Sequence, residues 1–387
     1  MRRMNNLVTL FTAMFAFFFG SFLTTLLTSV DKCPAPKSGV TKLEPHPELF
    51  LVILVLSAPQ YEEKRLGLRD TWLRLGQPLR LPYYPEDFIY LPTYNKRGHL
   101  EREEPSEQAN RLRIYVDWLD SVQSPKSSKV AERNIKIKHF FAIGTLGIHP
   151  NLRANLDKEQ EQFQDLLFLP RLIDVYANLT EKLLHSIDAL IHHYNFSYLL
   201  KVDDDTYVKL DYLLNELVSY DRKLIRKARD YRGDPLPALY WGYFNGRANI
   251  KTKGQWSESN YYLAQRYITY ALGGGYVLGR KLCEFVGNNS HHLSSYVSED
   301  ISVGTWLAGF RHVYRRHDPR FDTGYMSRKC RQHHLVLHKR NETLMRDLYN
   351  GKLCTFEAEN EKYLKRPTEY YYDWRRTADK CCDSLVV

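Results

Sequence analysis

The chain has 387 residues, 43% of them hydrophobic, and a formal net charge of +10, which is enough apolar material for one large domain or two smaller ones. It contains no internal repeat and no long low-complexity tract, which excludes a solenoid array and a largely disordered polypeptide. The positive charge suits nucleic acid, a membrane surface or an anionic ligand such as a nucleotide diphosphate, and it does not select among them.

The N-terminus has the pattern of a membrane anchor. Residues 7–30 carry no charge and follow Arg2 and Arg3, and about 20 apolar residues are enough to cross a bilayer. A cleaved signal peptide, the alternative, has a shorter apolar core that ends in small residues. We expect a cytoplasmic tail at 1–6, an uncleaved signal anchor at 7–30 and a lumenal remainder, because arginines before a span favour the cytoplasmic side.

Two further features agree with a lumenal location. Four N-x-S/T sequons are candidate glycosylation sites: Asn178, Asn195, Asn288 and Asn341. No cysteine spacing resembles a zinc site, so we expect disulfides in the C-terminal segment, with a pairing that the sequence does not determine. The six cysteines are Cys33, Cys283, Cys330, Cys354, Cys381 and Cys382.

The start of the folded region has the pattern of an α/β domain. Residues 31–46 predict a short stem and 47–387 the lumenal domain. The continuous apolar run at 48–59 predicts a buried parallel strand, and 61–75 predict the helix that follows it. A buried strand leading directly into a helix is how a nucleotide-binding α/β domain begins.

Residues 77–136 differ from their surroundings. They are rich in Pro, Arg, Glu and Ser and show no sustained period, which predicts an inserted, partly mobile loop. A strand follows at 135–144, then a helix and a short strand at 155–170, and an amphipathic helix at 174–194. The fold class that we expect is α/β, with a mostly parallel central sheet flanked by helices.

Three carboxylates stand at the end of the next predicted strand, 196–202. Asp203, Asp204 and Asp205 repel one another and are costly to bury without a cation. Ligands of open α/β sheets bind beyond the carboxyl ends of the strands, and alternate strand residues share a face. The pattern therefore predicts that Asp203 and Asp205 grip one divalent ion of the Mn²⁺ or Mg²⁺ type. A cap of the following helix, the alternative, explains one aspartate but not three.

Seven sequence blocks carry a family resemblance. They are RLGLRDTW (65–72), FAIG (141–144), DLLFLPRLIDVYANLTEKLL (165–184), LLKVDDDTYVKL (199–210), YWGYFNGR (240–247), YALGGGYVLG (270–279) and SEDISVGTWLAG (298–309). In this order they resemble the Golgi β-1,3-glycosyltransferases of glycosyltransferase family 31. YALGGGYVLG, HDPRFDTGY (317–325), LVLHK (335–339) and DWRRTADKCC (373–382) are most like the members that build the glycosaminoglycan–protein linker. The resemblance covers 47–387 apart from about 77–136.

The resemblance implies a GT-A fold, a nucleotide-sugar donor, manganese with magnesium as the alternative, and inversion at the anomeric carbon. Asp203, Asp204 and Asp205 match the metal motif of the family. His338 matches a histidine that completes the metal shell, for which a packed imidazole is the alternative.

Asp300 matches the general base of the family. A β-linkage made in one displacement from an α-linked donor needs a group that takes the proton of the attacking hydroxyl. Glu299 is the neighbouring competitor, and the pair can also cap the helix that follows.

Further residues match donor-side or acceptor-side blocks. The donor-side residues are Arg65, Arg69, Asp174, Asn178 and Lys201, together with Asp203 and Asp204. The arginines can instead bind the domain's own acidic residues, Lys201 can merely balance the aspartates, and Trp72 is interpreted as core.

Aromatic residues and glycines supply the acceptor-side candidates, which are Trp241, Tyr243, Gly274, Gly275, Tyr276 and Glu299. Aromatic rings suit sugar faces but also fill ordinary cores, and the glycines allow either close approach of a ligand or a plain tight turn.

The implied activity is that of a type II Golgi membrane enzyme, with 47–387 as its catalytic domain. It transfers galactose from UDP-galactose, in β1,3 linkage, to the Gal-β1,4-xylose of proteoglycan core proteins; no nucleic-acid partner is expected. Three alternatives stay open. They are a family member with another donor such as UDP-N-acetylglucosamine or another acceptor, a lumenal metal-dependent phosphohydrolase, and a non-catalytic polyanion-binding protein, whose binding would depend strongly on salt.

Overall fold

The computed structural model describes residues 8, 11–21, 49–74, 79–82, 84–123, 130–133, 135–231, 233–325, 328, 330–352, 369–382 and 384–385. The chain divides into two compact units, Met1–His46 and Pro47–Val387. In the first unit residues 11–21 are helical. Within the described part of the chain, no helix is both long and apolar enough to cross a membrane. The predicted tail, the predicted stem and half of the predicted anchor lie outside the described residues, as do Cys33 and Cys354.

The second unit is built on a sheet of seven strands: β1 (Leu49–Leu56), β4 (Ile137–Gly144), β5 (Leu166–Leu169), β6 (Phe196–Asp203), β8 (Ala238–Asn245), β9 (Tyr270–Gly279) and β10 (Val313–His317). Their order across the sheet is β10-β8-β9-β6-β1-β4-β5. Neighbours are parallel except for β9, which runs antiparallel to both β6 and β8. The expected α/β fold with a mostly parallel central sheet is therefore confirmed.

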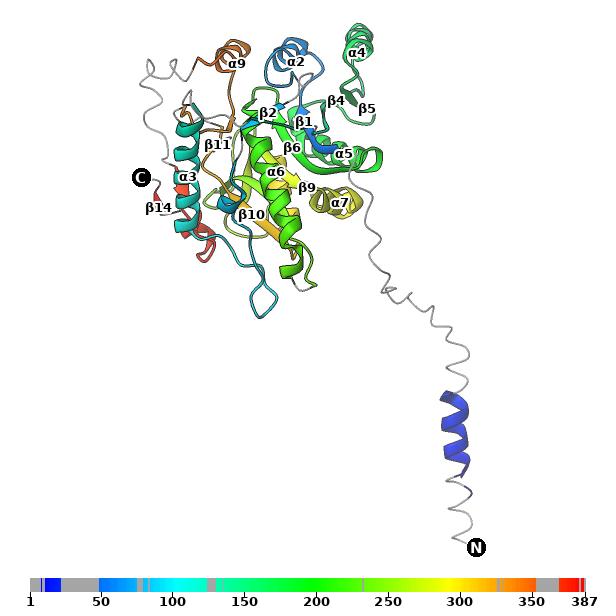
Figure 1. The fold of residues 1–387 in the computed structure, drawn as a ribbon. Coiled ribbons are helices and arrows are strands. Elements are labelled where there is room, and N and C mark those ends of the chain that lie inside the picture. The colour runs from blue at the N-terminus through cyan, green and yellow to red at the C-terminus, as the bar shows by residue number, and fades with distance from the viewer. Residues whose placement is uncertain are drawn as a thin grey trace. The chain divides into compact units, whose positions relative to one another are not determined.

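Helices cover both faces of this sheet (Figure 1). They include α2 (Glu62–Arg69), α3 (Pro105–Gln123), α4 (Pro150–Phe163), α5 (Leu179–His193), α6 (Leu210–Lys227), α7 (Arg280–Asn288), α8 (Glu299–Trp306) and α9 (Glu342–Tyr349). Along β1, Leu51, Ile53 and Val55 enter one hydrophobic cluster with α6, whereas Val52 and Leu54 enter another with α5 and α7. Alternate strand residues point to opposite faces, so the uninterrupted apolar run is explained by burial on both sides.

A small second sheet sets the position of the site. It contains β7 (Tyr207–Val208), β11 (Phe321–Asp322) and β12 (Val336–Leu337), in the order β11-β12-β7. β12 is antiparallel to β7. Residues directly after β12 therefore lie beside the residues directly before β7.

The segment 77–136, predicted as an inserted, partly mobile loop, contains a helix and a strand pair among the residues that the structure describes. β2 (Leu79–Pro82) pairs antiparallel with β3 (Val130–Arg133), and the 19-residue helix α3 lies between them in the sequence.

The residues on the buried face of α3 explain why the sequence shows no clear helical period of hydrophobicity there. Arg111 is only 4% exposed and binds Glu103 and Asp318 at 2.8 and 3.0 Å. Tyr115 and Leu119, four and eight residues further on, enter the core. A face that includes an arginine gives a weak hydrophobic period even though it is fully packed.

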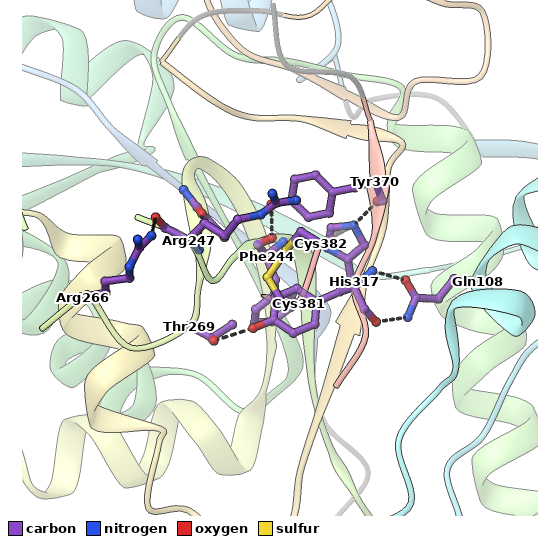
Figure 2. Close-up of a disulfide and its surroundings, with 11 residues drawn as sticks. Gln108, Phe244, Arg247, Arg266, Thr269, His317, Tyr370, Cys381 and Cys382 are labelled. Atoms are coloured by element: carbon purple, nitrogen blue, oxygen red, sulfur yellow. Dashed lines mark hydrogen bonds between the residues drawn. A yellow bond between two sulfur atoms is a disulfide. The ribbon is translucent and has the colours of Figure 1, made fainter. Parts of the chain in front are cut away.

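The C-terminal segment packs on β8, β9 and α3 around a disulfide between adjacent residues, Cys381 and Cys382 (Figure 2). In this segment β13 (Tyr370–Tyr371) pairs with β14 (Ser384–Leu385). Tyr372 exchanges backbone hydrogen bonds with the Gln108 amide at 2.9 and 3.0 Å. Hydrogen bonds rather than this disulfide therefore hold the segment on the domain, since the bond links neighbours. Cys330 is also disulfide-bonded, and Cys283 is a buried free thiol.

Candidate active site

Three potential metal ligands converge where β6 ends. Asp203 is the last residue of β6, Asp205 follows it by two, and His338 comes directly after β12. One ligand atom of each lies within 4.8 Å of the others. His338 Nε2 is 2.9 Å from Asp205 Oδ1 and 3.4 Å from Asp203 Oδ2. The β7–β12 pairing brings the imidazole to the aspartates across more than 130 positions of sequence.

The orientation of the His338 ring suits a metal ligand. Nδ1 lies 3.0 Å from the Gly324 carbonyl oxygen and donates to it, which turns Nε2 toward the aspartates. Nε2 thereby pairs with the carboxylates of Asp205 and Asp203. Burial lowers the pKa of His338, but the two carboxylates outweigh it and raise the pKa to about 9. Two carboxylates and an imidazole are a donor set that fits Mn²⁺ or a similar divalent ion.

Asp204 does not join this cluster. Its carboxylate accepts hydrogen bonds from Ser57 Oγ at 3.0 Å and from Lys64 Nζ at 2.9 Å. It points away from Asp203 and Asp205 because successive side chains at a strand end face opposite ways. Burial raises its pKa in spite of Lys64. The metal role that we predicted for Asp204 is therefore not supported by its position.

Lys201 contacts both Asp203 and Glu299, the residue next to the predicted general base Asp300. Its fully buried ammonium lies 2.8 Å from Asp203, 2.5 Å from Glu299 and 2.6 Å from the Gly273 carbonyl oxygen. Burial would raise the pKa of Asp203, but Lys201 and then His338 hold it below its usual range. With three partners on this ammonium, Lys201 positions carboxylates and is closed to a donor phosphate, contrary to the donor-binding prediction.

The acidic pair Glu299 and Asp300 separates into two environments. Glu299 is 4% exposed and is held by Lys201, which contradicts its assignment to the acceptor site. Asp300 is half-buried, and its carboxylate accepts from the backbone N–H of Gly273 at 2.9 Å and of Ile301 at 2.8 Å. Burial, and then the charge of Glu299, raise the pKa of Asp300 to about 8. A carboxylate that is open to a ligand and has a pKa near neutrality suits a general base.

The glycine run lies within β9 and forms no tight turn. A Cβ on Gly273 would lie 2.8 Å from Glu299 Oε1, and one on Gly274 would lie 2.5 Å from His338 Cγ. Both contacts are too short for a carbon atom. The missing side chains therefore make room for the carboxylates and the imidazole, so the glycines contribute to the site through these residues.

A cavity of about 410 Å³ opens beside the aspartates. Its lining includes Asp204, Asp205, Lys64, Lys339 and Arg340. Lys339 Nζ lies 2.9 Å from Asp205. Lys64 and Lys339 were not predicted, although each stands close to a family block, and their charges make this cavity fit for phosphate groups. A larger cavity, of about 870 Å³, is lined by residues such as Phe88 and Lys227 near the other end of α6 and by none of the predicted site residues.

Arg65 and Arg69 belong to a buried ion-pair network. Arg65, which is fully buried, binds both carboxylate oxygens of Glu159 at 2.8 and 2.6 Å. Arg69 binds Asp165 at 2.7 Å and Glu159 at 2.7 Å. The donor-binding prediction is therefore wrong for these arginines, and the alternative, binding to the domain's own acidic residues, is correct.

Asp174 and Asn178 support the structure around the end of β4 and the start of α5. Asp174 accepts from Gly144 N at 2.8 Å and from Lys182 Nζ at 2.6 Å. Asn178 precedes α5, and its amide donates to the Ile173 carbonyl oxygen at 3.0 Å. This contact engages the nitrogen to which a glycan would be attached. Of the other sequons, Asn288 and Asn341 are exposed and Asn195 is half-buried.

The predicted acceptor aromatics belong to the core. Trp241 is fully buried and donates its Nε1 proton to Asp318 at 2.8 Å. Tyr243 is 6% exposed and Tyr276 is fully buried. A sugar has no access to these rings, so the acceptor prediction is wrong for them, as is that for Gly275, which packs beneath Val336. Trp72 is buried as expected and donates to the Thr206 carbonyl oxygen just after the aspartates, at 3.0 Å.

Sequence comparisons show which known proteins this chain resembles. The family model described as Galactosyltransferase matches residues 110–318. The beta-1,3-galactosyltransferase 6 of Mus musculus is 34% identical over 370 residues, which cover 94% of this chain and 92% of that protein. The UDP-GalNAc:beta-1,3-N-acetylgalactosaminyltransferase 2 of Xenopus tropicalis is 30% identical over 155 residues, 40% of this chain and 29% of that protein.

Among solved structures, the 4-diphosphocytidyl-2C-methyl-D-erythritol synthase from Anaerococcus prevotii aligns with 70% of this chain and 87% of its own. The sequence identity is 11% and the TM-score 0.27, a level from which we draw no conclusion.

Proposed function

The chain belongs to the galactosyltransferase family, as the sequence blocks indicated, and from this premise we propose that it is a β-1,3-galactosyltransferase. Its donor is UDP-galactose and its acceptor the Gal-β1,4-xylose of proteoglycan core proteins, in the linker of glycosaminoglycans. The observation that carries the proposal is the 34% identity to a beta-1,3-galactosyltransferase along 94% of this chain. We further propose a GT-A architecture and a type II Golgi location with residues 7–30 as the anchor.

The residues divide the chemistry among them. Lys64 and Lys339 line the cavity beside the aspartates and hold the donor diphosphate. Asp203, Asp205 and His338 would hold Mn²⁺, or Mg²⁺ in its place, and such an ion would supply positive charge to offset the negative charge of the departing UDP. Asp203 is kept ionised by Lys201.

Asp300 acts on the acceptor. Its carboxylate takes the proton of the acceptor hydroxyl while that oxygen forms a bond to the anomeric carbon of the donor. The bond between the anomeric carbon and the phosphate oxygen breaks, and its electron pair leaves with UDP. One displacement of this kind inverts an α-linked donor to a β-linked product.

A donor panel tests the specificity. Purified full-length protein in detergent would be given UDP-galactose, UDP-N-acetylglucosamine or UDP-N-acetylgalactosamine with a Gal-β1,4-xyloside, and the products would be identified by mass. We expect transfer from UDP-galactose alone. Release of UDP that never depends on an acceptor would instead indicate a phosphohydrolase.

A further inference from the structure

Three aromatic side chains from separate segments meet on the surface. Trp256 donates a hydrogen bond from Nε1 to the hydroxyl of Tyr176. The ring centroids of Trp256 and Tyr325 are 4.7 Å apart, with the planes 79° from parallel. Tyr176 is 45% exposed and Tyr325 is 64% exposed. Rings that served only to pack against each other would be buried, so these faces remain available to a ligand.

This cluster borders the predicted catalytic residues. Tyr325 follows Gly324, whose carbonyl oxygen accepts from His338, and Lys339 Nζ lies 5.8 Å from the centre of the Tyr325 ring. Burial raises the pKa of the Tyr176 phenol, and the charges of Glu299 and Asp300 add to that rise.

Glu258 ties the Trp256 segment to the base. Its buried carboxylate accepts from the backbone N–H of Val297 at 2.8 Å and of Asn260 at 3.0 Å. Val297 stands three residues before Asp300. These bonds hold the backbone segment that carries Trp256 beside the residues that precede Asp300.

We propose that Tyr176, Trp256 and Tyr325 form an aromatic platform on which the pyranose ring of a neutral glycoside acceptor lies while its hydroxyl faces Asp300. None of the three lines the cavity that contains Lys64 and Lys339, so the platform serves the acceptor and not the donor diphosphate. Sugar rings expose C–H groups on one face, which pack on aromatic rings, and the uncharged rings match an uncharged acceptor. The inference rests on the proposed transferase function and adds the residues that recognise the acceptor.

A measurement of glycoside binding tests the platform without requiring catalytic turnover. Saturation-transfer NMR with a Gal-β1,4-xyloside would compare the full-length wild type with Trp256→Ala and Tyr325→Ala. Phe88→Ala is the matched control, because Phe88 is 41% exposed and lines the distant cavity. We expect the ring-proton signals of the glycoside to be lost in both platform variants and kept in the control. Equal signals in all four proteins, or none in the wild type, would overturn the platform.

Kinetics separate this inference from the proposed function. With UDP-galactose, the platform variants should raise the acceptor KM about tenfold, as expected for loss of about 1.4 kcal/mol. The control Phe88→Ala should keep the acceptor KM, the donor KM and the acceptor-free release of UDP within about twofold of wild type. A change in the donor KM alone contradicts the platform. If the wild type binds the glycoside through these rings and transfers no sugar, the proposed function fails and the platform stands. Tyr325, as an exposed side chain, can be removed without opening the core.

Discussion

Lys201 Nζ lies 2.5 Å from Oε1 of Glu299, and both side chains are almost entirely buried. This contact gives two adjacent carboxylates different properties. The charge of Glu299 is compensated by Lys201, whereas Asp300 receives hydrogen bonds from the backbone N–H groups of Gly273 and Ile301. Neighbouring acids whose environments differ in this way are suited to different roles.

Loss of the Lys201 ammonium should destabilise the domain strongly. Lys201→Met leaves the buried Glu299 without its cation and the partly exposed Asp203 with His338 alone, which costs about 3–5 kcal/mol. Urea denaturation followed by circular dichroism measures the free energy of unfolding. The control is Lys253→Met, which removes an exposed lysine and should change the stability by less than about 0.5 kcal/mol. Equal free energies of unfolding for the two variants would contradict the role of Lys201 as the cation shared by Asp203 and Glu299.

The rate of transfer should rise with pH through about 8. Burial, followed by the charge of Glu299, raises the pKa of Asp300 to about 8, and only the deprotonated carboxylate accepts a proton. Below that pH, kcat/KM should fall about tenfold per pH unit. Glu299→Gln removes the neighbouring negative charge and should move the midpoint to lower pH. A flat profile between pH 6 and 9, or an unmoved midpoint, would count against Asp300 as the base.

Metal affinity should discriminate among the three adjacent aspartates. Asp205→Asn and His338→Ala each remove a group of the convergent cluster and should weaken Mn²⁺ binding about tenfold or more. Asp204→Asn is the matched control, because its carboxylate lies on Ser57 and Lys64, and it should change the affinity by less than about threefold. Titration followed by electron paramagnetic resonance of free Mn²⁺ measures the Mn²⁺ affinity of all three variants. An equal loss of Mn²⁺ affinity in all three variants would show that Asp204 also binds the ion.

Arg111 tests whether the 77–136 segment is integral to the fold. Arg111→Ala removes a 4% exposed guanidinium from Glu103 and Asp318, with an expected loss of about 3–5 kcal/mol. Arg113 is nearby on α3 but is 65% exposed and binds Asp117 and Asn110 on the surface of the same helix, so Arg113→Ala should cost less than about 0.5 kcal/mol. If the thermal melts of the two variants coincide, the 77–136 segment is not integral to the stability of the domain.

Local pattern was sufficient for four strands of the main sheet, β1, β4, β5 and β6, and for part of the site. The apolar run of β1 predicted a strand that is buried on both faces. The position of the aspartates at the end of β6 predicted that Asp203 and Asp205 point the same way, because alternate residues of a strand share a face. His338 could be reached only through the family resemblance. Its proximity to Asp205 depends on the pairing of β12 with β7, which no local pattern encodes.

The errors arose where the partner of a side chain is distant in sequence. Arg65 has the chemistry of a phosphate ligand, yet Glu159, 94 positions away, occupies its guanidinium. Trp241 has the chemistry of a sugar-stacking ring, yet its strand is covered on both faces. A side chain's type restricts what it can bind, whereas tertiary packing decides what it does bind.

The most direct test determines the linkage of the product. Full-length protein would be incubated with UDP-galactose and a Gal-β1,4-xyloside, with and without Mn²⁺, and the glycosidic bond assigned by NMR; Asp205→Asn and Asp300→Asn would be assayed in parallel. We predict a β1,3-linked digalactosyl product that requires Mn²⁺ and is lost in both variants. A different linkage, or turnover that survives in Asp300→Asn, would contradict the proposed enzyme.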